Sequence, residues 1–193
     1  MTSRGLILLS SYIPDFHQGD SLPHSFLDNV EPNVKTQETL GITDKAKNTA
    51  IVSATLGTWL PKHREGVTKP LIDGFVNTLR TTPGTNKVGA VGFCWGGRYA
   101  LLEAHGPAEN ENGSKIGGVD AAIAYHPALV TVPGDFEPLK VPFSLAVGTK
   151  DSLLDQSMLG KIQDTIAKLT EIPHELRVSF QRFDALLKVM SLM

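Results

Sequence analysis

The chain contains one junction at which an apolar strand pattern passes directly into a helical one. Residues 87–93 (KVGAVGF) are a short apolar run, and helical spacing begins after the turn Cys94-Trp95-Gly96-Gly97 and continues to about residue 104. The glycines flanking Cys94, Gly92 and Gly96, are expected where strand and helix pass closely, because a Cβ atom there would clash. The junction therefore predicts a strand–turn–helix unit, which favours folds that alternate strands with helices.

The same alternation continues on both sides of the junction. Helices are expected over residues 45–60, 65–80, 153–169 and the tail 183–193, and further strands over residues 6–13, 119–125, 141–147 and 175–180. Residues 15–35 and 106–117 are rich in polar and turn-forming residues and are expected to be loops. This order predicts one α/β domain over residues 1–193, with a mostly parallel sheet and helices on both faces.

Composition excludes several classes of partner. The net charge is -2, and acidic and basic residues are interspersed, so neither a nucleic-acid-binding stripe nor a membrane-binding basic patch is expected. The apolar run at residues 6–13 is too short to span a membrane. The single cysteine excludes an internal disulfide and, with no secretory signal in the sequence, indicates a cytoplasmic protein. Neither a metal-ligand spacing nor a phosphate-binding glycine motif occurs, so no metal or cofactor is expected.

Cys94 is the strongest candidate for chemistry. A Gly-x-nucleophile-x-Gly turn between strand and helix exposes the nucleophile above the edge of the sheet. The positive end of the following helix dipole stabilises a thiolate, which is the reactive form of cysteine. The backbone N–H of Trp95 is expected to donate to an oxyanion. The alternative is a cysteine packed in a tight turn without a catalytic role.

An acid and several histidines are candidates to assist the cysteine. Asp151 follows the strand at 141–147, which fits the chain order nucleophile, acid, histidine; the alternative is an N-cap for the next helix. His126 ends the strand at 119–125. His17 and His24, on the loop at 15–35, are candidates to line a substrate pocket, whereas His63 and His105 are expected to be solvated or to cap helix carbonyls.

Four segments together resemble the dienelactone hydrolase family of α/β-hydrolases. Residues 91–100 (VGFCWGGRYA) are similar to its nucleophile segment, and three others resemble loops or strand ends of fungal members: 13–23 (IPDFHQGDSLP), 119–127 (VDAAIAYHP) and 146–154 (AVGTKDSLL). The resemblance implies an α/β-hydrolase-type three-layer sandwich with Cys94 as nucleophile and Asp151 as the acid of the triad. It also implies hydrolysis of enol-lactones or small esters through an acyl-thioester, without a cofactor.

The chain departs from this family at its C-terminal end. The family's histidine follows the last strand, usually as His-Gly-Phe, but residues 181–193 (QRFDALLKVMSLM) contain neither histidine nor glycine. Residues 178–193 are therefore expected to be an atypical tail. His174 is expected at the start of the last strand, about 20 Å from the reactive edge of the sheet, so His126 is the candidate surrogate base. The alternative for His126 is a pocket or turn residue.

The family pattern also places strands and a helix before the strand expected at residues 6–13, so the fold is expected to be incomplete at its N-terminal end. Two functions remain in view. The first is a cysteine-dependent hydrolase that acts on a small ester or lactone. The second is an inactive member of the family that serves as a binding module or is a non-functional gene product. Thiol redox sensing is disfavoured because the chain has no second cysteine. The sequence does not indicate an oligomeric state.

Overall fold

The computed structural model describes residues 10–23, 26, 41–109, 111–149, 151 and 153–179. The chain divides into two compact units, residues 1–71 and 72–193, called here the first and the second unit. The expected single domain over residues 1–193 stays a prediction.

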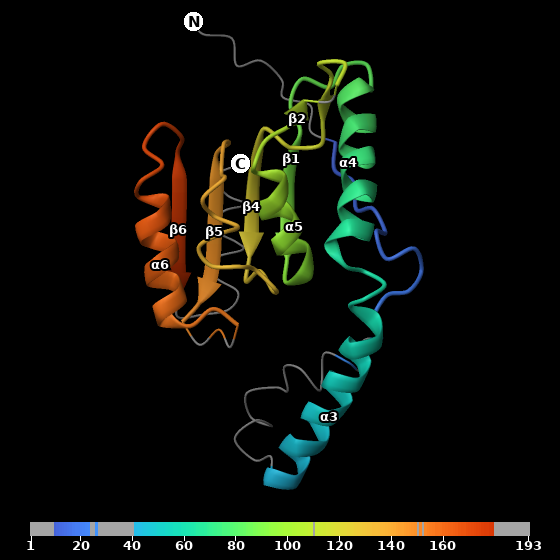
Figure 1. Cartoon of the computed structure of the whole chain (residues 1–193), viewed down its shortest axis with the longest axis vertical. Helices are drawn as coiled ribbons and strands as arrows, with labels where there is room; N and C mark the ends of the chain where they lie inside the picture. Colours follow the sequence, from blue (N-terminus) through green and yellow to red (C-terminus); the bar gives the residue numbers. More distant parts are fainter. Residues whose placement is uncertain are drawn as a thin grey trace, which may run out of the picture. The chain divides into compact units, whose positions relative to one another are not determined.

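The first unit contains helix α3 (Ile42–Trp59) and the beginning of α4 (Glu65–Thr81), which continues into the second unit (Figure 1). These helices confirm the predictions at 45–60 and 65–80. The strand expected at 6–13 is wrong over its described part, because residues 10–13 have no regular structure and Ile13 is 98% exposed. An extended segment becomes a strand when a neighbour satisfies its backbone groups, and no described strand pairs with this one. Residues 6–9 lie outside the described residues, as do His24 and most of the predicted loop after it.

The second unit is built on a four-stranded parallel sheet in the order β1-β4-β5-β6. The strands are β1 (Gly89–Phe93), β4 (Ala121–Tyr125), β5 (Phe143–Gly148) and β6 (His174–Ser179). They confirm the four strands expected in this part of the chain. Because all four run parallel, their carboxyl ends meet at one edge of the sheet, the lower edge in Figure 1.

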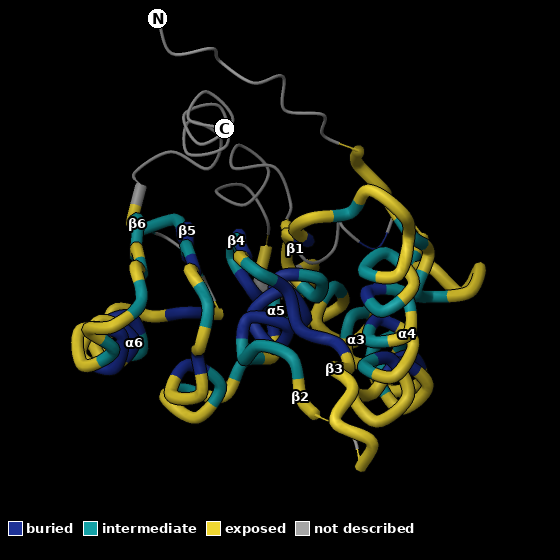
Figure 2. The backbone as a smooth tube through the Cα atoms, turned by 90° about the horizontal axis from the view of Figure 1, so that it is seen from above, coloured by how far each residue is buried: buried dark blue, intermediate teal, exposed yellow. Residues whose placement is uncertain are grey.

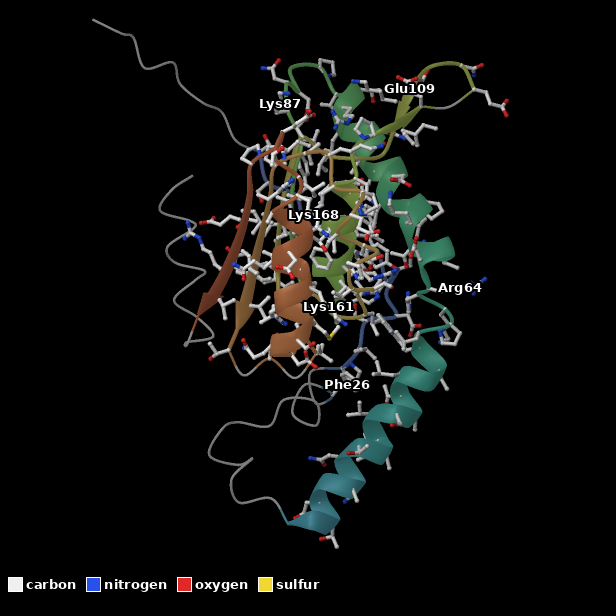
Figure 3. All side chains as sticks on the ribbon, turned by 60° about the vertical axis from the view of Figure 1, so that its left-hand side comes forward. Phe26, Arg64, Lys87, Glu109, Lys161 and Lys168 are labelled. Carbon is white, nitrogen blue, oxygen red and sulfur yellow. The ribbon has the colours of Figure 1, made fainter. Side chains whose placement is uncertain are left out.

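Two helices lie wholly within the second unit, α5 (Trp95–Glu103) and α6 (Gln156–Ile166). Figure 2 shows both on the same face of the sheet. The core includes Leu101, Leu145 and Ile162, none of which is exposed, whereas Lys161 points outward from α6 (Figure 3). The predicted α/β fold with a parallel sheet is thus confirmed, while helix cover of the other face stays a prediction.

The predicted loop at 106–117 contains an antiparallel hairpin of two short strands, β2 (Ala108–Glu109) and β3 (Lys115–Ile116). It was missed because strands of two residues are too short to show an apolar period. Glu109 and Lys87 both lie at the amino-terminal edge of this unit, away from the carboxyl ends of the strands (Figure 3).

The ends of the expected elements differ slightly from those observed. Val178, expected to begin an atypical tail, belongs to β6, which ends at Ser179. The helix expected at 183–193 lies outside the described residues. None of the helices in the described part of the chain combines the length and apolarity needed to cross a membrane.

Candidate active site

Cys94 occupies the junction between β1 and α5, at the N-cap position of the helix. Its φ is 51° and its ψ is -116°, and the residue is exposed. Its N–H donates to the Tyr125 carbonyl at 3.0 Å, and its own carbonyl accepts from Gly97 at 3.0 Å and Ala128 at 2.9 Å. A non-glycine residue with such a backbone costs roughly 1–3 kcal/mol and persists only where its surroundings hold it. These three hydrogen bonds hold Cys94 in that conformation.

A Cβ is sterically forbidden at Gly92 and crowded at Gly97, whereas the sequence predicted close contacts at Gly92 and Gly96. A Cβ at Gly92 would lie 2.5 Å from the Gly96 carbonyl carbon and 2.8 Å from the Gly97 nitrogen, which is sterically forbidden. A Cβ at Gly97 would lie 3.1 Å from the Pro127 Cα. The prediction for Gly96 is wrong, since a Cβ there would meet nothing within 4 Å. Gly97 rather than Gly96 is therefore the residue of α5 that faces the loop after β4.

The strand register brings His126 next to Cys94. Phe93 pairs with Tyr125 and Tyr125 pairs with Ala146, so the residues that follow β1 and β4 leave adjacent strands at the same edge. Neighbouring strands lie about 4.8 Å apart. His126 has a φ of 36°, and its N–H donates to the Ala146 carbonyl at 2.8 Å. Its ring forms no hydrogen bond or ion pair within the described part of the chain.

Asp151 lies beyond β5, the neighbour of β4 on the side away from β1. Its Oδ1 accepts hydrogen bonds from the N–H groups of Leu153 at 2.8 Å and Leu154 at 3.0 Å, which close a turn. The alternative N-cap function is wrong, because α6 begins five residues later, at Gln156, and its N-cap is Asp155, which accepts from the Met158 N–H at 2.8 Å. Asp151 therefore belongs to the turn that follows β5, the strand next to β4.

Backbone strain in the second unit is concentrated at this edge. Three of its described non-glycine residues have a positive φ: Cys94, His126 and Leu129, the last at 62°. All three follow β1 or β4 directly or within a few residues. Strained residues of this kind cluster at functional sites, so the edge is the best candidate for an active site in this unit. Sequence reasoning missed Leu129, because no sequence signal marks a leucine with a positive φ.

Two other histidines of the second unit lie elsewhere. His174 begins β6 and pairs with Phe143 at the amino-terminal edge, which confirms that it is remote from the ends of the strands. Burial lowers the pKa of His174. The Nε2 atom of His105 is 2.8 Å from the Asp135 carbonyl oxygen, so His105 binds a carbonyl as predicted, but not that of its own helix.

His17 lies in the first unit, in an aromatic cluster formed with Trp59 and His63. The ring centroid of His17 is 5.1 Å from that of Trp59 and 5.4 Å from that of His63. Asp20 joins the cluster, since its Oδ2 is 3.1 Å from His63 Nε2 and its carbonyl accepts from Trp59 Nε1 at 2.8 Å. The expectation that His63 is solvated or caps a helix is therefore wrong, because Asp20 binds a ring that is buried against Trp59. A place for His17 in a substrate pocket stays a prediction.

The charges around this cluster give it a defined response to acid. Burial and the neighbouring His63 lower the pKa of His17, and Asp15 and Asp20 oppose this. Hydrogen bonds from His63 and Lys62 lower the pKa of Asp20. A histidine with a lowered pKa takes up its proton more readily in the unfolded chain, so stability falls as the pH drops below about 6.5. The contribution of Asp20 is lost only below about pH 4.

We therefore expect the first unit to unfold at a lower temperature near pH 5.5 than near pH 7.5. Trp59 fluorescence in a Trp95→Phe protein reports on this unit, since the chain has two tryptophans. His17→Gln in the same background should reduce the difference between the two pH values. An equal difference with and without His17 would contradict the assignment.

In the described residues, no three His, Cys, Asp or Glu side chains are grouped to hold a metal ion.

Comparison with known proteins identifies similar chains. A model of the dienelactone hydrolase family matches residues 12–179. Hydrolase pyvD of Aspergillus violaceofuscus is 22% identical over 120 residues, which are 62% of this chain and 44% of that protein. The crystal structure of a protein assigned as a dienelactone hydrolase from Klebsiella pneumoniae aligns with a TM-score of 0.50 and 21% identity, over 64% of this chain and 51% of that one. The chain thus spans about half the length of these relatives.

Proposed function

The chain belongs to the dienelactone hydrolase family, with the α/β-hydrolase-type sheet expected of it, and we propose that it hydrolyses small carboxylic esters or lactones with Cys94 as the nucleophile. The observation that carries this proposal is an exposed cysteine with a φ of 51° at the start of α5. The helix dipole at that position favours the thiolate. His126 and Leu129 also have strained backbones at this edge of the sheet, which supports placing the reaction there.

In the first step, the Cys94 sulfur attacks the carbonyl carbon of the ester. The carbonyl oxygen becomes an oxyanion, to which the Trp95 backbone N–H donates a hydrogen bond. Collapse of this intermediate breaks the bond to the alcohol oxygen and leaves an acyl group on sulfur. The alcohol departs with a proton from His126 or from water, or as an anion when it is as acidic as p-nitrophenol.

In the second step, water attacks the thioester and Cys94 leaves as thiolate. His126 takes a proton from that water, and the negative charge of Asp151, in the turn that follows the neighbouring strand β5, stabilises the resulting imidazolium. No histidine follows β6 in this sequence, so His126 is the candidate base and deacylation is the slow step. The chemistry requires a reduced thiol, so we place the protein in the cytoplasm, and we expect its partner to be a small ester or lactone rather than a nucleic acid or a membrane.

The test is to identify the intermediate in the full chain. After mixing with p-nitrophenyl acetate, intact-mass analysis should detect one added acetyl group, and peptide mapping should locate it on Cys94. His126→Gln should slow loss of this acetyl group about 100-fold, since a general base contributes roughly that much or more. His174→Gln is the matched control, because it removes a histidine from the opposite edge and should leave deacylation unchanged.

Two results would count against the proposal. An acetyl group found only on lysine side chains would exclude Cys94 as the nucleophile. A folded chain whose Cys94 reacts neither with the ester nor with iodoacetamide at neutral pH would favour the non-catalytic alternative, a binding module.

A further inference from the structure

Leu129 combines two unfavourable features. Its φ of 62° lies in the left-handed region, where a Cβ atom crowds the backbone and glycine or asparagine is the usual residue. The residue is also 55% exposed, so burial in the core does not offset the strain. A strained residue that does not stabilise the fold is a reason to look for a binding function.

The backbone keeps Leu129 close to the nucleophile. The N–H of Ala128 donates to the Cys94 carbonyl at 2.9 Å, so the Cα of Leu129 lies within about 8 Å of that oxygen. The next turn is closed by a pair of hydrogen bonds of 2.9 Å, from Thr131 N–H to Asp135 Oδ2 and from Asp135 N–H to the Thr131 carbonyl. Leu129 is therefore held between two anchored segments, so its position does not depend on a mobile loop.

We propose that Leu129 contacts the acyl chain of the ester and gives the site a preference for apolar acyl groups. This inference rests on the proposed function. The acyl group remains bonded to Cys94 after the alcohol departs, so a neighbouring apolar side chain contacts it before and after that step. Contact with the acyl chain removes apolar surface of Leu129 from water, which the fold itself does not do. Each methylene buried in this way strengthens binding about fourfold.

The test measures acylation in single turnover, so that slow deacylation does not enter. Rates of p-nitrophenol release are compared for p-nitrophenyl acetate, butyrate and hexanoate. In the unmodified chain the rate should rise with acyl length, and Leu129→Gly should reduce the ratio of hexanoate to acetate about fourfold or more. Leu129→Asn, which also tolerates a positive φ, should act in the same direction, whereas Leu129→Met should retain the ratio.

A control separates this effect from general apolarity. Ile116→Ala removes a side chain that is 37% exposed on β3, in the hairpin at the amino-terminal edge, and should leave the ratio unchanged. A ratio unaltered by Leu129→Gly and Leu129→Asn, with the acylation phase intact, would overturn the assignment of Leu129 alone. The same decrease for all three esters would also overturn it, because it would indicate positioning of Cys94. Absence of an acylation phase in the unmodified chain would overturn the proposed function as well.

Discussion

Mixed with excess p-nitrophenyl acetate, the chain should release a single equivalent of p-nitrophenol rapidly and then nearly stop. The rapid phase reports attack by the Cys94 thiolate, which the start of α5 favours and which needs no base once the thiol is ionised. The slow phase reports deacylation, for which the sequence has no histidine after β6. Cys94→Ala should lower the rate of the rapid phase at least about 1000-fold, the scale on which loss of a nucleophile acts.

The matched controls test the sulfur and the fold separately. Cys94→Ser keeps the approximate size of the side chain but replaces a thiolate with a hydroxyl, which is not ionised at neutral pH and is a weak nucleophile, so its rapid phase should also be lost. Circular dichroism should show that both variants retain the secondary structure of the unmodified chain. Rapid release that persists in Cys94→Ala would remove Cys94 from the mechanism and leave the reaction at that edge unexplained.

Gly92→Ala should destabilise the second unit by about 3 kcal/mol or more, because strand and helix would have to separate to admit a Cβ. The position offers no flexible side chain that can move aside, since the nearest atoms belong to the backbone of Gly96 and Gly97. For a chain of this size, the midpoint of thermal unfolding should fall by roughly 6–12 °C. Differential scanning calorimetry measures the shift.

Gly160→Ala provides the control. Gly160 lies within α6, and a Cβ there would meet nothing within 4 Å. Alanine favours a helix over glycine by about 0.5–1 kcal/mol, so this variant should be as stable as the unmodified chain or more so. If Gly92→Ala were equally harmless, the close contact between β1 and α5 would not exist in solution.

Elements with a strong local pattern agree well with the structure. Helices α3 and α4 follow apolar spacing of helical period, and β1, β4 and β5 are short apolar runs bounded by glycine, proline or turn residues. The junction at Cys94 is predictable for the same reason, since a strand, a glycine-rich turn and a helix succeed one another within a few residues. The segment at 6–13 has an equally apolar pattern, but its described residues 10–13 form no strand, because a strand also needs a paired neighbour, which a pattern cannot supply.

The candidate site was predictable only in part. The family resemblance names Cys94, Asp151 and the strand order, and the observed order of β1, β4 and β5 agrees with the placement of His126 between the other two. Nothing in the sequence distinguishes Gly97 from Gly96 as the glycine at which a Cβ would be crowded. That distinction depends on the Pro127 atoms that face the helix from the loop after β4.

By itself, the amino-acid order determined the helices, most strands and the exposed cysteine, because each depends on residues that are neighbours along the chain. The tertiary structure alone decided that Asp20 binds His63, 43 residues away, and that Leu129 has a left-handed backbone next to the Cys94 carbonyl. Contacts of this kind form only when separate segments pack together. Their geometry therefore follows from the packing of the whole unit rather than from any local pattern.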